Sequence, residues 1–469
     1  MLQAAIVQVN HIALTHLQLE YPLAALVMLV GVLAVGGLVP LRQRRLAVAI
    51  WIVVAAAGVV FMVVALVYPQ VPHGVTFAGG LFLDSPAATT MTLVLFLIAL
   101  GSSWLFLGED SGEVRLLAMA IATCGATCLL WANTLLAAFV GGEVVISGAA
   151  ALVVLPKERK EFVTVIDATT VWFGQASAAL MIGILLLGVA TGGHLLSGTV
   201  RMVSPAAVVL GVALVASVPW LVIGGMFRSD ARSGRGNGST ALGAALLYLP
   251  ITEFAVRLLA RSASTFDGVG PFMVWIGAGS LVVALLGLLR SQSLTHGIGW
   301  LTLYSWGMLA LTLSSQAAVK SLVPVAMLEL SGTSIALIVV IYSGMWRDHS
   351  RGSSRRIASA LGGVGALSII SVPPGGGVIQ PLAVMQALVS GHLGWAIIPF
   401  LALMVLTAVV VITHLDGEAE VEDGGGQRWS VEATVAIAGI VVLVVTNLGA
   451  MILAPTMRLV AAALLGGKA

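Results

Sequence analysis

Long apolar stretches follow one another along almost the whole chain, separated by short polar loops. Each stretch runs for roughly 17 to 25 residues, the length that an α-helix needs to cross a lipid bilayer. Fourteen stretches are found, beginning near Tyr21, Ala47, Thr89, Val114, Thr134, Thr169, Val203, Ser239, Gly270, Gly297, Ser321, Arg356, Leu393 and Val431. The pattern predicts an all-α polytopic membrane protein with about 14 transmembrane helices.

The twelfth apolar stretch is interrupted in its middle. The interrupting residues are Pro373, Pro374, Gly375, Gly376 and Gly377. Two adjacent prolines remove two backbone donors and the glycines accept unusual dihedral angles, so the freed carbonyl groups need water or protein partners at membrane depth. Such a break usually lines an ion or substrate path, although a proline kink kept for packing is an equal alternative.

The amino-acid composition agrees with a membrane location and excludes several classes of function. Of 469 residues, 59% are hydrophobic and 9% are charged, and the mean hydropathy is +1.08. The net charge of +2 is spread over short loops, which argues against nucleic-acid binding. Cys124 and Cys128 are interpreted as small apolar residues, and sequences typical of nucleotide or haem binding are absent. We therefore expect no catalytic, cofactor-binding or metal site in this chain.

Basic residues predict which side of the membrane each loop faces. Sixteen of the 22 Lys and Arg residues fall in loops that follow the odd-numbered stretches or at the helix ends beside them. Because Lys and Arg concentrate in cytoplasmic loops, we expect these loops in the cytoplasm and both termini outside it. The prediction is a multi-pass protein of the cell inner membrane.

Four segments, in order along the chain, resemble one known family. They are Gly112–Leu155, Thr169–Gly193, Trp300–Leu309 and Ser368–Leu382. The first contains GEVVIS from Gly142 to Ser147, the third reads WLTLYSWGML and the last reads SIISVPPGGGVIQPL. In these segments the chain is similar to the antiporter-like membrane subunits of respiratory complex I (NADH-quinone oxidoreductase) and of Mrp cation/proton antiporters, most closely to the subunit N type.

The resemblance implies two inverted five-helix repeats, each with a broken helix, and a central row of ionisable residues that joins two half-channels. The implied divisions are three leading helices in 1–113, the two repeats in 114–262 and 263–415, and an acidic loop with a last helix in 416–469. A second helix break is then expected around Pro219, as the counterpart of the break at Pro373.

The glutamate that the family carries in its fifth helix corresponds to Glu143, which lies among glycines and apolar residues. A carboxylate there is costly unless it is protonated, hydrated or paired, which suits a group that exchanges protons. The alternative is a structural glutamate that is hydrogen-bonded to a neighbouring helix or subunit.

Three lysines of the family are absent from this chain. The corresponding positions are Leu214, Ile251 and Pro381. The Lys-Arg pair that precedes the family's Leu-Leu-Ala-Tyr-Ser element becomes Gly299-Trp300, and a histidine becomes Leu309. Without a lysine partner, Glu143 cannot use the Glu/Lys pair switching proposed for the family.

Other charged residues also fall within apolar stretches. Glu253 and Arg257 are four apart, so they share one helix face with the glutamate on the N-terminal side. They are interpreted either as a structural ion pair or as a relay that replaces the lost lysines. Glu329 is a further carboxylate at membrane depth.

The predicted function is a proton-translocating antiporter-like subunit of a NADH:quinone oxidoreductase type complex. Its partners would be other membrane subunits, and NADH, flavin, iron–sulfur clusters and quinone would bind only to those partners. One alternative is a scaffold subunit that has lost the lysine relay, in a related hydrogenase or an ion or carbon transport complex. A second alternative is a stand-alone cation/proton antiporter.

Overall fold

The computed structural model describes most of the apolar part of the chain. The described residues are 21–67, 76–77, 81–83, 86–103, 106, 112–154, 159–191, 204–233, 248–258, 260, 269–291, 294–315, 318–350, 353–372, 379–417, 433–441 and 443. Nearly all of them are helical, because a helix satisfies its backbone hydrogen bonds internally where the bilayer offers no water.

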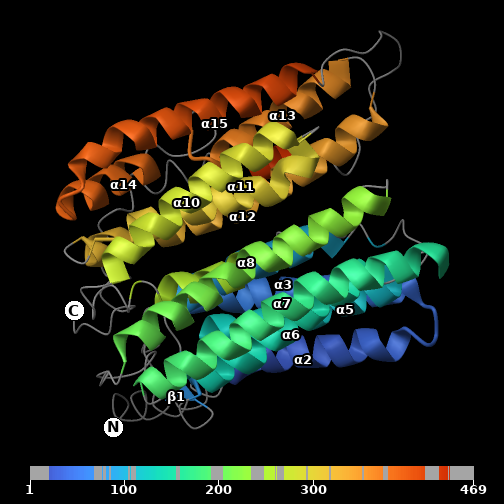
Figure 1. The fold of residues 1–469 in the computed structure, drawn as a ribbon. Coiled ribbons are helices and arrows are strands. Elements are labelled where there is room, and N and C mark those ends of the chain that lie inside the picture. Colours follow the sequence, from blue (N-terminus) through green and yellow to red (C-terminus); the bar gives the residue numbers. More distant parts are fainter. Residues whose placement is uncertain are drawn as a thin grey trace, which may run out of the picture.

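The first half of the chain forms one helical bundle, coloured blue to green in Figure 1. Its helices are α2 (Tyr21–Leu38), α3 (Arg44–Val67), α4 (Pro86–Ser102), α5 (Gly112–Trp131), α6 (Leu135–Val154), α7 (Arg159–Thr191) and α8 (Pro205–Ser233). Two short strands, β1 (Thr76–Phe77) and β2 (Phe82–Leu83), pair antiparallel between α3 and α4. A helical segment, 248–258, follows α8 in the sequence.

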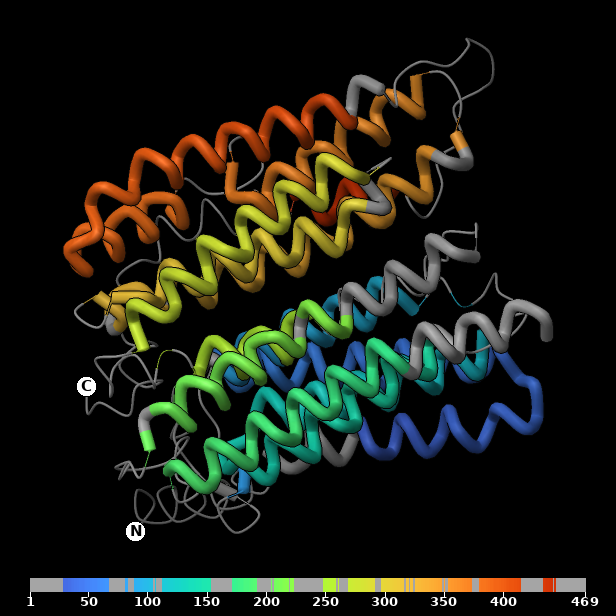
Figure 2. The backbone as a smooth tube through the Cα atoms, viewed as in Figure 1, coloured from blue at the N-terminus to red at the C-terminus, as the bar shows by residue number. Residues whose placement is uncertain are grey.

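The second half forms another bundle, coloured yellow to red in Figure 1. Its elements are α10 (Val269–Arg290), α11 (Leu294–Thr312), α12 (Val319–His349), α13 (Ser353–Ile369), α14 (Ile379–Ser390), the short helix η2 (Gly394–Ala396) and α15 (Ile397–Gly417). Residues 433–441 are also helical. Figure 2 shows the chain passing back and forth along each bundle.

The helix α11 lies where the two bundles meet. It packs against α8 of the first bundle and against α10, α12, α13, α14 and α15 of the second. Residues 301–315 are all buried. Helix α12 also reaches across, because Ser331 and Tyr342 contact Met91 and Gly101 of α4. The bundles therefore share one continuous apolar core.

The outer surface is apolar, as a lipid-facing surface must be. Within the described residues, seven helices are long and apolar enough to cross a membrane. The outermost of them expose large side chains such as Val53 on α3, Trp275 on α10 and Ile398 on α15, which are 67%, 78% and 77% exposed. Together with the buried polar positions described below, this pattern confirms an all-α polytopic membrane protein.

The two expected helix breaks differ in the structure. Helix α13 ends at Ile369 and α14 begins at Ile379, and Pro373, Pro374, Gly375, Gly376 and Gly377 lie between them, outside the described residues. Pro219 instead lies inside α8, which continues as one α-helix from Pro205 to Ser233. The expected interruption at Pro219 is therefore wrong. A single proline removes one backbone donor, and a membrane helix tolerates that loss more readily than the loss of two donors beside three glycines.

Candidate functional site

Glu143 lies in the middle of α6 and faces α7. The Ser177 hydroxyl lies 2.9 Å from each of its two carboxylate oxygens and donates its one proton to the carboxylate. The side chain is half-buried. Among the described residues no cation lies within ion-pair distance of this carboxylate, so a neutral hydroxyl is its hydrogen-bond partner.

The glycines around Glu143 allow the neighbouring helices to approach closely. A Cβ atom on Gly141 would lie 2.8 Å from the backbone nitrogen of Leu129 on α5, and one on Gly148 would lie 2.8 Å from the Cα of Ala122. Glycines at such contacts let membrane helices pack backbone to backbone. The glycines thus hold α6 against α5 while Glu143 points toward α7.

Glu253 and Arg257 form the expected ion pair in the segment 248–258. The Nη2 of Arg257 donates to Glu253 Oε2 at 2.9 Å. The guanidinium also donates to the backbone carbonyls of Leu129 and Ala132, at 2.9 Å each, where α5 ends. A cation at a helix C-terminus satisfies carbonyl groups that lack helical partners. Arg257 is therefore used to anchor one helix on another, which favours the structural interpretation over a relay.

The three positions where the family carries lysine are apolar in the structure as well as in the sequence. Leu214 packs partly buried against the core from α8, whereas Ile251 and Pro381 are buried. The described residues place no basic side chain at these positions, and no described contact joins Glu143 to Glu253, Arg257 or Glu329.

Glu329 lies in α12, and its carboxylate contacts Ser371, which follows the end of α13. It is buried, and its carboxylate and the side-chain oxygen of Gln380 both lie within hydrogen-bond distance of the Ser371 hydroxyl. Ser371 has one proton, so it can donate to only one of them. Gln380 Nε2 is buried without a partner. With the Gln380 amide turned over, Nε2 donates to Ser371 and Ser371 donates to Glu329, so that each of the two contacts has one donor and one acceptor.

The backbone at the end of α13 explains how Ser371 reaches Glu329. Ser371 has a φ of 57°, in the left-handed region that favours glycine. Val372 N donates to Leu367 O and Ser371 N donates to Ser368 O, the two hydrogen bonds of a Schellman helix end. A serine at this strained position supplies a hydroxyl that glycine lacks, and that hydroxyl binds the carboxylate.

A row of three hydroxyls, Tyr248, Ser305 and Thr333, crosses from the segment 248–258 through α11 to α12. Tyr248 donates to Ser305 at 3.0 Å, and Ser305 and Thr333 lie 3.1 Å apart. All three side chains are buried. Sequence reasoning missed this hydroxyl row, since isolated Ser, Thr and Tyr residues in apolar helices usually bond to their own backbone.

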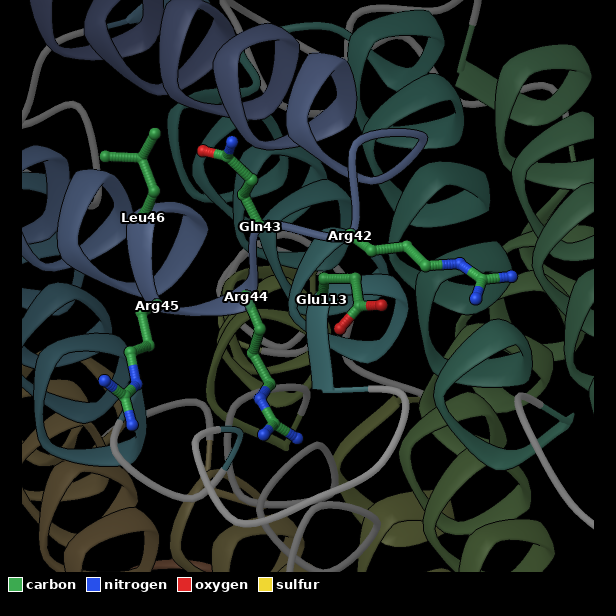
Figure 3. A pocket seen from close by; sticks show the side chains of 6 residues that line it. All are labelled: Arg42, Gln43, Arg44, Arg45, Leu46 and Glu113. Atoms are coloured by element: carbon green, nitrogen blue, oxygen red, sulfur yellow. The ribbon is translucent and has the colours of Figure 1, made fainter.

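The described charged groups outside the apolar core gather at helix ends. Arg42, Arg44, Arg45 and Glu113 surround a shallow depression of about 570 Å³ at the turn between α2 and α3 (Figure 3). The side chains of Arg42 and Arg45 point away from each other, so they do not converge on a ligand. Arginines in such a loop are typical of a cytoplasmic membrane face.

The sequence matches no protein-family model and no curated protein. Solved structures do match. A chain of respiratory complex I from Thermus thermophilus is 18% identical, with a TM-score of 0.66, over 92% of this chain and 99% of that one. A chain of an archaeal membrane-bound sulfane sulfur reductase is 16% identical, with a TM-score of 0.70, over 95% and 97%.

A chain of the Mrp complex from Dietzia sp. DQ12-45-1b is also similar, at 17% identity and a TM-score of 0.66, over 94% of this chain and 98% of that one. At these identities the likeness shows the fold. It confirms, at that level, the resemblance to antiporter-like subunits that the four sequence segments predict, and all three matched chains belong to multi-subunit membrane complexes.

Proposed function

We propose that the chain is a proton-translocating, antiporter-like membrane subunit of a NADH:quinone oxidoreductase type respiratory complex. The observation that carries the proposal is the pair of intramembrane carboxylates, Glu143 and Glu329, each bonded to a serine hydroxyl. An ionisable group at membrane depth is expensive and is usually kept for function. A carboxyl group whose partner is a hydroxyl can hold or release a proton without breaking an ion pair.

The complex would lie in the cell inner membrane, with both termini of this chain outside the cytoplasm. NADH, flavin, iron–sulfur clusters and quinone would bind to partner subunits, because this chain lacks the sequence elements that bind such groups. The shared fold supports assembly with other membrane subunits.

A scaffold subunit is the second candidate, and the apolar side chains at Leu214, Ile251 and Pro381 favour it. Such a subunit would bury its neighbours without moving protons. It would belong to a related hydrogenase or to an ion or carbon transport complex.

The test uses inverted membrane vesicles from cells that contain the chain, cells from which its gene is deleted, and cells in which Glu143→Gln replaces the native chain. The vesicles are energised with NADH, or pulsed with NaCl, and acidification is followed with a pH-sensitive dye. NADH-driven acidification that requires the chain and is lost in Glu143→Gln supports the proposal. Unchanged acidification in Glu143→Gln, with the complex assembled, contradicts it and supports a scaffold. A response to NaCl alone indicates a cation/proton antiporter.

A further inference from the structure

We propose that the hydroxyl row Tyr248, Ser305 and Thr333 conducts protons between the two bundles and delivers them to Glu329. The inference rests on the proposed function, because it names the path between the two halves of a proton-translocating subunit. In the family, lysines belong to the row that joins the two half-channels, and the corresponding positions of this chain are apolar. The inference assigns that connection to three neutral side chains instead.

The hydrogen bonds of the row differ from those of neighbouring hydroxyls. On α11 and α12, the buried hydroxyls of Thr312, Ser331 and Ser334 each donate to the carbonyl four residues earlier. Ser305 and Thr333 instead bond to each other, and in the described residues neither donates to a backbone carbonyl. Their protons are therefore free to be exchanged along the row rather than held by the helix.

The number of hydroxyl protons in the row also allows proton exchange along it. Tyr248 donates to Ser305, and one hydrogen bond joins Ser305 and Thr333, so one of those two hydroxyls keeps a proton that this row does not use. When a proton arrives on one oxygen, that hydroxyl releases its own proton to the next oxygen. Rotation about each C–O bond then restores the starting arrangement, and no electrons move.

Both ends of the row lead to polar groups. Thr252 lies one helical turn beyond Tyr248 on the same helix face, and its side chain is fully buried. At the other end, Glu329 lies one turn before Thr333 on the same face of α12, and it is bonded to Ser371. The row thus runs from the segment 248–258 to the carboxylate beside the gap between α13 and α14.

The position of the row fits a connection between the bundles. Ser305 lies within the fully buried part of α11, which packs against both α8 and α12. The buried apolar side chains of α11 keep bulk water away from Ser305, so a proton that crosses here must use the hydroxyls.

The decisive experiment replaces hydroxyls one at a time in the assembled complex and measures dye-reported acidification of inverted vesicles, driven by NADH or by a NaCl pulse. Tyr248→Phe, Ser305→Ala and Thr333→Val each remove one hydroxyl with little change in volume. Each should lower the initial rate about tenfold, because a proton must then cross a position with no hydrogen bond. Thr333→Ser is smaller but keeps the hydroxyl, and it should retain the native rate.

Matched controls remove hydroxyls outside the row. Ser334→Ala deletes a hydroxyl that donates to Leu330 O, and Tyr304→Phe deletes a buried hydroxyl that has no hydrogen bond to the row. Both should transport at the native rate. Native rates in Tyr248→Phe and Ser305→Ala, or a loss in Thr333→Ser as large as in Thr333→Val, would overturn the inference while leaving the proposed function standing. Vesicles in which the native complex moves no protons would overturn both.

Discussion

Each bundle contains a carboxylate that is hydrogen-bonded to a serine hydroxyl, but the two serines lie in different backbone settings. In the first bundle Glu143 accepts from Ser177, and both residues lie inside regular helices, α6 and α7. In the second bundle Glu329 accepts from Ser371, which lies at the end of a helix with its backbone in the left-handed region. The first hydroxyl is positioned by helix packing alone. The second is positioned by backbone strain, which glycine would avoid.

The same contrast appears in the prolines. Pro219 lies inside the continuous helix α8, whereas α13 and α14 are separate helices on either side of residues 373–378. A strained residue that persists at such a place is a reason to look for function there. The end of α13 is therefore a second candidate region, although the sequence resemblance draws attention first to Glu143 in the other bundle.

The largest expected effect on stability is that of replacing Arg257. Its contacts with Glu253 and with the end of α5 give it a structural role in the first bundle. Arg257→Met leaves Glu253 buried and unpaired and frees two carbonyls at the end of α5. Removing one partner of a buried pair typically costs about 3–5 kcal/mol. We expect a lower thermal midpoint of the purified complex, but an unchanged proton yield from the complexes that assemble. A native midpoint combined with lost proton transport would instead make Arg257 part of a relay.

The double variant Glu253→Gln and Arg257→Met is the control for that experiment. It removes both charges together, so it should be more stable than Arg257→Met alone.

A smaller loss of stability is expected from a substitution at the close contact between α6 and α5. In Gly148→Ala the added Cβ would meet the backbone of Ala122, which cannot move without shifting the helix. Overpacking of this kind costs about 1–3 kcal/mol. Gly279→Ala on α10 is the control, because nothing lies within 4 Å of its added Cβ. Equal thermal midpoints for the two variants would show that the close packing around Glu143 contributes little to stability.

The smallest expected change in stability is that of replacing Ser371. Two variants at this position separate the effect of backbone strain from the effect of losing the hydroxyl. Ser371→Gly relieves a left-handed backbone that costs a non-glycine residue about 1 kcal/mol, and it also removes the hydroxyl from Glu329. We expect a thermal midpoint equal to or slightly above the native one, together with slower proton transport. Ser371→Ala keeps the strain and should lose transport without any gain in stability. Native transport in both variants would show that the serine is not needed at this helix end.

The sequence predicts most of the fold because apolar length and bilayer thickness decide it. The run from Leu135 to Val154, for example, forms α6 with Glu143 in its middle, as the pattern predicts. The spacing of Glu253 and Arg257 likewise predicts their ion pair, because both lie on one helix.

Contacts between distant helices are not visible in the sequence. Nothing in the neighbouring sequence distinguishes Ser177 or Ser371 from other serines. Ser177 is 34 residues from Glu143, and Ser371 is 42 residues from Glu329, so their hydrogen bonds depend on how distant segments pack. The hydroxyl row is hidden for the same reason, since Tyr248 and Ser305 are 57 residues apart. The prediction at Pro219 failed because a proline pattern alone does not say whether neighbouring helices keep the backbone continuous.

The most direct test of the central claim compares Glu143→Gln, Glu329→Gln and the double variant in assembled complexes, by the initial rate of vesicle acidification. If protons pass both carboxylates in series, each single variant should lose about 100-fold in rate, and the double variant should lose little more. Native rates in all three variants would contradict the account and leave the chain as a scaffold.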